Sequence, residues 1–403
     1  MKTVLFVGAG RHQRRAIRRA KELGLRVAAI DRNADAPGFA DADVIEVVDF
    51  AAVGAAVAAA RRLAPDGVLT IASDRAVPVV AAIAETLGLP GIGAEAALFA
   101  TNKIAMRGAL AAAGVPQPRF ASVRTVTDAQ AAAPEIGLPV VIKPADSAGQ
   151  RGLSLVRSEN DLAAAVVAAL AESQSGEAIV EAFLDGAEVN CLAVARDGDV
   201  TLLTLSDRRR PGGDGFGVCL AHVFPATIDG ESAAEAERVA TAAVRAIGLQ
   251  DSVAYPQLLV SADGVRVVEI AARVPAGLMD EVARVGIGVD LVEVALRQAL
   301  GERVPDELLR ASARQPLAIR FLTAEPGPLP TGVVRSVNGL QRALDAPGVV
   351  GGDSYLVAGE TIRLPRVDGD RRGYVIAVGD TGEEAAARAD AAAALVEVEV
   401  ERG

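Results

Sequence analysis

Short apolar runs alternate with amphipathic segments along the first hundred residues. Four runs rich in Val, Ile, Leu and Ala are typical of buried parallel strands. They lie at 3–7, 26–30, 44–48 and 67–71. Helices are expected at 11–23, in the Ala-rich stretch between 48 and 67, and after the fourth run at 78–87. Strands that alternate with helices in this way predict an α/β domain built on a doubly wound parallel sheet.

The pattern changes after residue 100. Thr101 or Asn102 can cap a helix that begins near Lys103, because a short polar side chain accepts hydrogen bonds from the first backbone N–H groups. Gly114 ends that helix. Strand-like runs then follow at 139–143, 153–156, 178–181, 188–195 and 200–205. This strand-rich stretch predicts an α+β segment rather than a continuation of the first sheet.

The second half carries another hairpin signal. Strands are expected at 254–260 and 265–270, joined by the Asp263-Gly264 turn, after a helix at 233–247. A helix at 290–300, short strands rich in Gly and Pro, and a last helix from Glu383 follow. We therefore expect a Rossmann-like domain over 1–100, linker helices with a small subdomain over 101–205, and a larger subdomain with a β-rich C-terminal part over 206–403.

Composition narrows the classes of function. Of the 403 residues 51% are hydrophobic but only 3% aromatic, so aliphatic side chains must fill the core. The net charge of −11 argues against a nucleic-acid partner, and local cations such as the run at 208–210 could hold an anionic ligand. Two unpaired cysteines favour a reducing, cytoplasmic location. No uncharged apolar stretch is long enough to predict a membrane span.

The Gly8-Ala9-Gly10 turn between two expected strands, with Asp31 after the second, is one candidate for a dinucleotide site. The third glycine of that fingerprint is replaced by Gln13, and a glycine turn also serves tight passage from strand to helix. A dinucleotide-dependent oxidoreductase is therefore an alternative from a different class of enzyme.

The segment 141–153 is the strongest chemical feature. An expected strand delivers Lys143 into a loop of small residues that includes Ser147, Gly149 and Gly152. Glycines let backbone N–H groups approach a phosphate closely, and the lysine adds a fixed positive charge. No helix with Gly-Lys-Ser/Thr follows, so this is not a Walker A loop. An ordinary hairpin with an exposed lysine is the competing interpretation.

Further segments, in order and spacing, resemble the ATP-grasp superfamily. They are Lys103 with Arg107 before Gly114, the stretch 181–188, the Glu-x-x-x-Arg pattern at 269–273, and the stretches 371–379 and 383–385. The resemblance covers nearly the whole chain. It is closest to carboxylate–amine ligases related to bacterial L-amino-acid ligases, with biotin carboxylase and purine-biosynthesis carboxylases more distant.

The resemblance implies an ATP site between two subdomains. Lys103 and Lys143 would neutralise phosphates, and the loop with Ser147, Gly149 and Gly152 would close over the γ-phosphate. Adenine and ribose would be met by the hinge. The hinge residues implied are Glu181, the backbone of Phe183 and Leu184, and Glu188 for the ribose hydroxyls. The alternative is that Glu181 and Glu188 are solvent-exposed glutamates on one face and bind no ligand.

The same resemblance implies a metal site for Mg²⁺ or Mn²⁺ at Gln257 and Glu269. These residues lie twelve positions apart across the Asp263-Gly264 turn, so their side chains can face one site. The family usually has Glu at the first position, although carbamoyl phosphate synthetases in this superfamily also use Gln. Ala271 replaces the family's Asn, so we expect a weakened second metal position completed by water.

Catalytic and substrate roles fall on a few residues. Arg273 would stabilise an acyl phosphate or hold a substrate carboxylate, with backbone N–H groups near Gly277 assisting. His222 would orient or deprotonate the amine. Ser73 and Asp74 follow an expected strand at the edge where open sheets bind ligands. A surface salt bridge for Arg273, and an ordinary core or surface histidine at position 222, are the competing interpretations.

The expected reaction is ATP-dependent ligation in two steps. A substrate carboxylate takes the γ-phosphoryl group, and the acyl phosphate is then attacked by an amine, which forms an amide or peptide bond and leaves ADP and phosphate. Small-molecule carboxylates and amines are the expected partners, with a homodimer as a candidate assembly. A biotin-carboxylase-like or purine-type carboxylase that uses bicarbonate, and an ATP-binding protein without catalysis, remain alternatives.

Overall fold

The first sheet of the computed structural model, which describes residues 1–211 and 217–401, is parallel with helices on both faces. Its strand order is β3-β2-β1-β4. The strands are β1 (Thr3–Val7), β2 (Arg26–Asp31), β3 (Val44–Val47) and β4 (Gly67–Leu69). Alternate residues of β1 face opposite sides, so Val4 and Phe6 share a core with α1 (Arg11–Glu22), while Leu5 shares one with α2 (Val53–Leu63) and α3 (Val77–Leu87). The predicted doubly wound domain is confirmed.

Two linker helices lead to a small antiparallel sheet. Helix α4 (Gly93–Thr101) is followed by α5 (Lys103–Ala112), and the Asn102 side chain accepts hydrogen bonds from Ile104 N and Ala105 N as predicted for a cap. The sheet has the order β5-β8-β6-β7. Its strands are β5 (Phe120–Val123), β8 (Ala178–Ala182), β6 (Val140–Pro144) and β7 (Ser154–Val156), and its helices are α6 (Val126–Ile136) and α7 (Glu159–Glu172).

The largest sheet has eight strands in the order β13-β12-β9-β10-β11-β14-β18-β16. Its first four strands are β13 (Gly264–Ala271), β12 (Ser252–Ser261), β9 (Ala187–Arg196) and β10 (Asp199–Arg209). The other four are β11 (Ala221–Phe224), β14 (Leu317–Phe321), β18 (Gly373–Val378) and β16 (Val349–Ser354). Helix α8 (Gly230–Ala246) covers the β12–β13 hairpin through Ala236, Val239 and Ala243. The boundary expected between residues 205 and 206 falls inside β10, so we propose instead a boundary in the β8–β9 connection.

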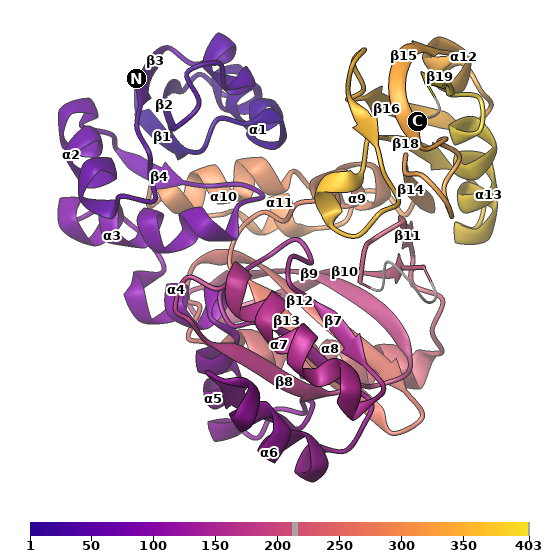
Figure 1. The fold of residues 1–403 in the computed structure, drawn as a ribbon. Helices are drawn as coiled ribbons and strands as arrows, with labels where there is room; N and C mark the ends of the chain where they lie inside the picture. The colour runs from indigo at the N-terminus through magenta and orange to yellow at the C-terminus, as the bar shows by residue number, and fades with distance from the viewer. Residues whose placement is uncertain (212–216, 402–403) are drawn as a thin grey trace.

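The C-terminal part combines strands of the large sheet with a small sheet of its own. That small sheet has the order β17-β15-β19 and comprises β17 (Thr361–Ile362), β15 (Gly332–Asn338) and β19 (Glu397–Glu401). Helices α12 (Leu340–Leu344) and α13 (Gly382–Ala393) pack nearby. Figure 1 shows this part and the N-terminal domain as two upper lobes above the body that holds β8 to β13.

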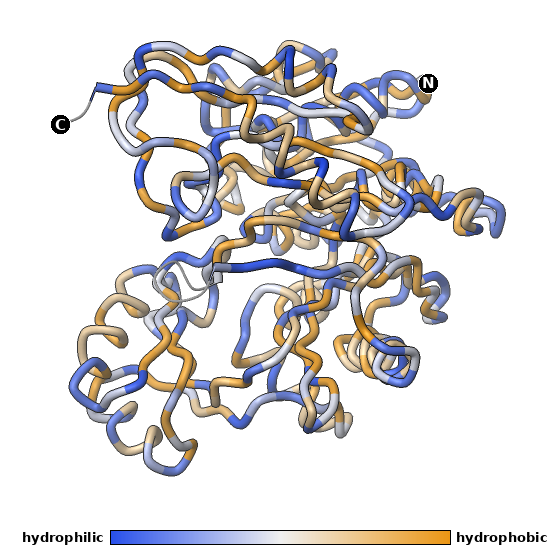
Figure 2. The backbone as a smooth tube through the Cα atoms, turned by 90° about the vertical axis from the view of Figure 1, so that its right-hand side faces the viewer, coloured by the Kyte–Doolittle hydropathy of each residue, from blue (hydrophilic) through white to orange (hydrophobic). Residues whose placement is uncertain are grey.

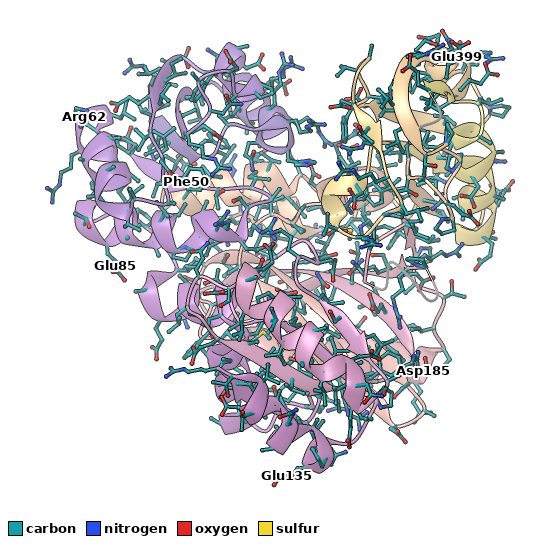
Figure 3. The ribbon with its side chains drawn as sticks, in the orientation of Figure 1. Phe50, Arg62, Glu85, Glu135, Asp185 and Glu399 are labelled. Atoms are coloured by element: carbon teal, nitrogen blue, oxygen red, sulfur yellow. The ribbon has the colours of Figure 1, made fainter. Side chains whose placement is uncertain are left out.

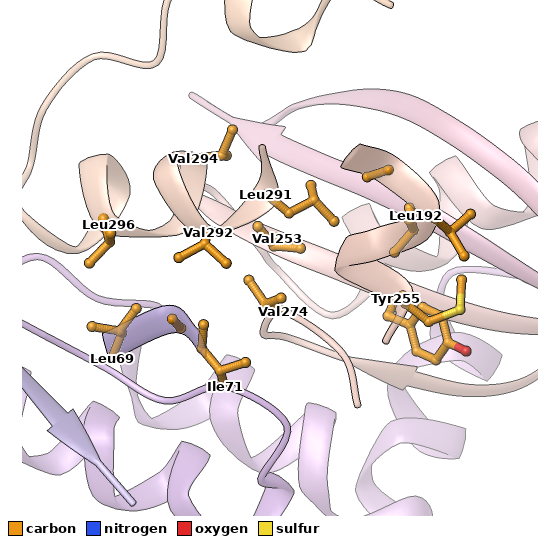
Figure 4. Packing of buried hydrophobic residues seen from close by; sticks show 14 of the residues in the cluster. Leu69, Ile71, Leu192, Val253, Tyr255, Val274, Leu291, Val292, Val294 and Leu296 are labelled. Carbon is orange, nitrogen blue, oxygen red and sulfur yellow. The ribbon is translucent and has the colours of Figure 1, made fainter. Parts of the chain in front are cut away.

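A continuous core joins the N-terminal domain to the large sheet (Figure 4). Leu69 and Ile71, at the end of β4, lie in the same cluster as Val253, Val274 and residues of α10 (Leu291–Ala299). Ile71 forms a parallel bridge with Val274, and the N–H of Ala72 donates to the Val274 carbonyl at 3.0 Å. This junction brings the residues after β4 beside the residues after β13.

Ion pairs reinforce the same junction. Arg15 and Arg19 of α1 contact Asp280 at 2.7 Å and Asp290 at 2.6 Å. Asp280 belongs to α9 (Met279–Ile287), and Asp290 caps α10; the short α11 (Asp306–Leu309) follows. These contacts fix the first lobe against the body.

The surface carries most of the charge. Hydrophobic and hydrophilic stretches alternate along the backbone in Figure 2, and the labelled Arg62, Glu85, Glu135 and Glu399 lie at the periphery in Figure 3. Within residues 1–211 and 217–401, no helix has the length and apolar character needed to cross a membrane.

Candidate active site

A buried charge network lies between the small sheet and the large sheet. Lys143, at the end of β6, is 6% exposed, and its Nζ lies 2.8 Å from Glu181 Oε2. The other oxygen of Glu181 accepts from Arg107 Nε at 2.9 Å. Burial raises the pKa of Glu181, but the charges of Arg107 and Lys143 outweigh it and lower the pKa to about 2. The carboxylate is therefore ionised, and Lys143 is held in place rather than exposed.

The loop after Lys143 has the backbone that the sequence predicted. Gly149 has φ +71° and Gly152 has φ +68°, a left-handed conformation that favours glycine. A Cβ on Gly152 would also lie 2.9 Å from Pro144 Cγ. Lys103 reaches this loop from α5, donates to the Ser147 carbonyl at 2.7 Å and lies 3.4 Å from Glu269 Oε1. Both lysines thus meet at one end of a cavity.

That cavity, the nucleotide cavity, collects the residues predicted for ATP. It is lined by Lys103, Lys143, Ser147, Gly149, Glu181, Phe183, Leu184, Glu188, Gln257 and Glu269. The hinge prediction changes in one respect, because the N–H of Phe183 donates to the Pro139 carbonyl at 3.0 Å. The Phe183 N–H is therefore engaged by the protein itself. Gly152 lies against Pro144 of β6 and against α7 instead of lining the cavity.

Glu188 is engaged by two arginines that the sequence analysis treated only as a basic run. Arg208 Nη1 lies 2.6 Å and Arg210 Nε lies 2.9 Å from the Glu188 carboxylate. Arg208 also donates to the Gly217 carbonyl at 2.5 Å. A ribose hydroxyl would have to share this carboxylate with both guanidinium groups, so binding of ribose by Glu188 stays a prediction.

Gln257 and Glu269 are direct cross-strand neighbours in the β12–β13 hairpin. Both line the nucleotide cavity and a second cavity next to it. In the described ranges no group of three or more His, Cys, Asp or Glu side chains could hold a metal ion. An amide oxygen and a carboxylate do fit Mg²⁺, which typically takes one or two protein carboxylates and completes its shell with water and phosphate oxygens.

The second cavity, the substrate cavity, has a volume of about 370 Å³ and contains the residues predicted to hold substrate. Ser73, Asp74, His222, Arg273 and Gly277 all line it. The structure pairs two of them with each other, since Arg273 Nε and Nη2 donate to the two Asp74 oxygens at 2.9 and 2.8 Å. This pair bridges the N-terminal domain and the end of β13.

His222 lies on the wall of the substrate cavity. It is 3% exposed, and its ring packs edge-on against Phe321 at 5.7 Å between centroids. Burial, with Arg208 and Arg371 nearby, holds its pKa well below the usual range. His222 Nδ1 lies 2.9 Å from Asn190 Nδ2, and His222 Nε2 lies 3.5 Å from Cys219 Sγ. His222 is thus a buried neutral imidazole whose two ring nitrogens both contact buried side chains.

The C-terminal part supplies residues that the sequence analysis did not single out. Arg371 Nε donates to the Asp368 carbonyl at 3.0 Å, and the guanidinium lies 4.3 Å over the Phe321 ring. Arg371, Asp368 and His12 of α1 all line the substrate cavity. Burial, Arg371 and Arg11 lower the pKa of His12 to about 4, so this imidazole is neutral at pH 7. The stretch 371–379 carried a resemblance, but nothing in it marked Arg371 as a wall residue.

The glycine turn of the first domain is occupied by the protein's own side chains. Asp31 accepts from the N–H of Ala9 at 2.8 Å and of Asn33 at 2.9 Å. Gln13 covers Gly8 and Gly10 and donates to the Ile71 carbonyl at 2.5 Å. These contacts favour a structural turn over a dinucleotide site.

Comparison with known families assigns two stretches of the chain. Residues 102–307 match the model of the carbamoyl-phosphate synthase L chain ATP-binding domain, and residues 320–401 match the L-amino acid ligase C-terminal domain 2. An uncharacterized protein of Sinorhizobium fredii is 30% identical over 314 residues, which cover 77% of this chain and 63% of the relative. The formate-dependent phosphoribosylglycinamide formyltransferase of Chlorobaculum tepidum is 30% identical over 371 residues, which cover 86% of each.

Solved structures share the whole fold at lower identity. The L-amino acid ligase from Bacillus licheniformis superposes with a TM-score of 0.85 at 20% identity, covering 100% of this chain and 99% of that one. The phosphoribosylglycinamide synthetase from Anaerococcus prevotii gives 0.78 at 20% identity, covering 99% and 100%. These structures therefore confirm the predicted fold, in which a parallel N-terminal sheet is followed by antiparallel sheets.

Proposed function

This chain belongs to the ATP-grasp family of ATP-dependent ligases that form C–N bonds, and on that premise we propose that it joins a small-molecule carboxylate to an amine through an acyl phosphate. The observation that carries the proposal is the contact between its two cavities. Gln257 and Glu269 line both, so a nucleotide γ-phosphate and a substrate carboxylate can meet beside the same pair of oxygen ligands.

In the first step the substrate carboxylate attacks the γ-phosphate, and ADP leaves. Lys103 and Lys143 neutralise the phosphates, and the loop that contains Ser147 and Gly149 covers them. Mg²⁺ or Mn²⁺, when bound, adds charge neutralisation, and Gln257 and Glu269 are the residues that would hold it. Because the lysines are already fixed by Ser147 and Glu181, little reorganisation is needed when ATP binds.

In the second step the amine attacks the acyl phosphate, and phosphate leaves. Arg273 lines the substrate cavity, and its Nε and Nη2 donate to the two carboxylate oxygens of Asp74. It orients the acyl phosphate or the substrate carboxylate. His222 contributes a neutral imidazole that orients a substrate, since a pKa held well below the usual range by burial opposes a role as a base. A profile of turnover against pH with an ionisation near 6.5 that disappears in His222→Asn would contradict this role.

A bicarbonate- or formate-using reaction is the second candidate function. The 30% identity to a formate-dependent formyltransferase supports it, together with Arg371, a partly buried cation in the substrate cavity that suits an additional anionic group on the substrate. The two candidates differ in the carboxylate that is activated, not in the site.

A screen for substrate-stimulated ADP release tests the proposal. Purified protein with ATP and Mg²⁺ is offered amino acids singly and in pairs, then formate and bicarbonate each with amine acceptors. Release stimulated by amino acids and accompanied by a new amide supports the ligase, whereas stimulation by formate or bicarbonate alone supports the second candidate. ATP binding without stimulated turnover by any of these substrates would contradict both.

A further inference from the structure

Arg107 is a fully buried arginine whose guanidinium holds three segments together. Its Nε donates to Glu181 of β8 at 2.9 Å. Its Nη1 and Nη2 donate to the carbonyls of Val267 at 2.9 Å and Val268 at 2.8 Å, both in β13. Arg107 itself has 0% exposure. Its Nη1 also makes a longer contact of 3.5 Å with Gln117 Oε1. A charge buried this completely is retained only where its partners are well placed, so these contacts define a fixed geometry.

The two carbonyls belong to an irregularity in the β12–β13 ladder. Leu258 pairs with Val267, but the next residue, Gln257, pairs with Glu269, so Val268 is an extra residue in β13. Consecutive carbonyls of a regular strand point to opposite edges, whereas those of Val267 and Val268 both accept from one guanidinium. Arg107 therefore binds the backbone of a β-bulge, a feature that often redirects a side chain next to an active site.

The bulge determines where Glu269 points. In an uninterrupted ladder Gln257 would face Val268, and Glu269 would lie on the other face of the sheet, because side chains alternate with period two. The extra residue places Glu269 opposite Gln257, where both line the two cavities. The side chain that stabilises the bulge thus acts on the proposed metal pair without touching it.

We propose that Arg107 is a positioning residue that fixes the bulge at Val268, aims Glu269 at the metal position, and couples it through Glu181 to the phosphate-binding Lys143. This inference rests on the proposed function of the site. Lysine at position 107 could keep one charged contact with Glu181, but its single ammonium cannot reproduce a planar fork that reaches two carbonyls and a carboxylate.

The test compares Arg107→Lys with Arg196→Lys. Arg196 also donates to a carbonyl, that of Val304 at 2.8 Å, and to a carboxylate, Asp306 at 2.5 Å, but it lines neither cavity. Two quantities are measured: Mn²⁺ affinity in the presence of a non-hydrolysable ATP analogue, followed by electron paramagnetic resonance, and the Mg²⁺ concentration for half-maximal ADP release. Affinity for the analogue without metal, together with the melting midpoint, reports general damage.

Arg107→Lys is expected to weaken Mn²⁺ binding and raise the Mg²⁺ requirement by about tenfold, because it loses the hydrogen bonds that hold the two bulge carbonyls. Its affinity for the analogue without metal should change less, and Arg196→Lys should leave both metal readouts unchanged. Equal metal affinity in Arg107→Lys and wild type would overturn the inference, even with a lowered melting midpoint, since that pattern is a purely structural role.

A second variant covers the case in which Arg107→Lys does not fold. Gln117 Nε2 donates to the Arg107 carbonyl at 2.9 Å, so Gln117→Leu loosens the arginine without removing it. A smaller shift of Mn²⁺ affinity in the same direction supports the inference, and no shift counts against it. If wild type binds Mn²⁺ and the analogue but releases no ADP with any substrate, the proposed function fails while the metal readout still decides the role of Arg107.

Discussion

The nucleotide cavity and the substrate cavity share Gln257 and Glu269 but are assembled in different ways. Every residue that lines the nucleotide cavity lies between Lys103 and Glu269, on α5, on strands of the two sheets and on the loops that connect them. The substrate cavity draws its walls from all three parts of the chain, from His12 in the first helix to Arg371 near the C-terminal strands. The nucleotide cavity lies between two neighbouring sheets, whereas the substrate cavity exists only where all three parts of the chain meet.

The difference extends to the charges. In the nucleotide cavity the side chains of Lys143 and Glu181 are 7% and 5% exposed. Arg107, at 0%, completes a charge network that is buried within the protein. In the substrate cavity Asp74 is 22% exposed while pairing with Arg273 across two domains. A preorganised nucleotide site suits the reaction with ATP. Because outer domains form the walls of the substrate cavity, those walls can vary with the substrate while the reaction with ATP stays the same.

Loss of the shared carboxylate should have the largest effect. Glu269→Gln removes the only acidic side chain of the proposed metal pair, and we expect ADP release to fall by about 100-fold or more, since a lost contact to a charged group costs up to about 3 kcal/mol. Steady-state kinetics at saturating Mg²⁺ gives the comparison, with circular dichroism as a check on the fold. Normal turnover by this variant would show that the metal assignment is wrong.

Loss of a cation on the nucleotide side should come next. Lys143→Ala removes a buried charge and leaves Glu181 to Arg107 alone, so we expect weaker ATP binding and lower turnover, by about 30-fold in kcat/KM for about 2 kcal/mol. The KM for the carboxylate should change much less, because Lys143 does not line the substrate cavity. An unchanged KM for ATP with unchanged turnover would contradict the assignment of the loop after Lys143 to ATP. An equal rise in the KM for ATP and the KM for the carboxylate would show that the two cavities do not act independently.

The sequence predicts those features of the site that are determined by residues close together in the chain. The Asn102 cap and the Asp263-Gly264 turn follow from neighbouring residues, and the structure confirms both. The Gln257–Glu269 pairing was expected from the family resemblance and the twelve-residue separation across the turn, but a regular hairpin would have placed Val268 opposite Gln257. The expectation held only because of a bulge that the hairpin's turn pattern did not reveal.

Contacts between segments that are distant in the sequence could not be predicted, for a physical reason. Asp74 and Arg273 were each assigned to the substrate, yet their pairing depends on the Ile71–Val274 bridge between two domains. Arg371 and His12 come together only because the C-terminal strands return to the large sheet. Periodicity reports which face of an element is buried, not which other element covers that face.

On the substrate side, Arg273→Lys should impair turnover more than ATP affinity. Lysine retains a charge but cannot hold both Asp74 oxygens and a substrate anion, and we expect about a tenfold loss of turnover, consistent with one charged hydrogen bond. Nucleotide binding by calorimetry is compared with turnover, and Asp74→Asn serves as the matched variant that loosens the same pair from the other side. Equal losses in ATP binding and turnover would assign Arg273 to folding rather than to the substrate cavity.

The smallest effect is expected where the two cavities meet, at Gln257. Gln257→Glu replaces an amide oxygen by a carboxylate, which is the better ligand for a hard cation, so the Mg²⁺ concentration for half-maximal ADP release should fall about threefold. The gain is limited because the new charge lies opposite Glu269 and repels it when no metal is bound, although Lys103, 3.4 Å from Glu269, offsets part of that repulsion. A magnesium titration of this variant beside Glu269→Gln measures both directions at one site. A raised Mg²⁺ requirement in Gln257→Glu would mean that residue 257 faces phosphate rather than metal, because a carboxylate there would then repel the nucleotide.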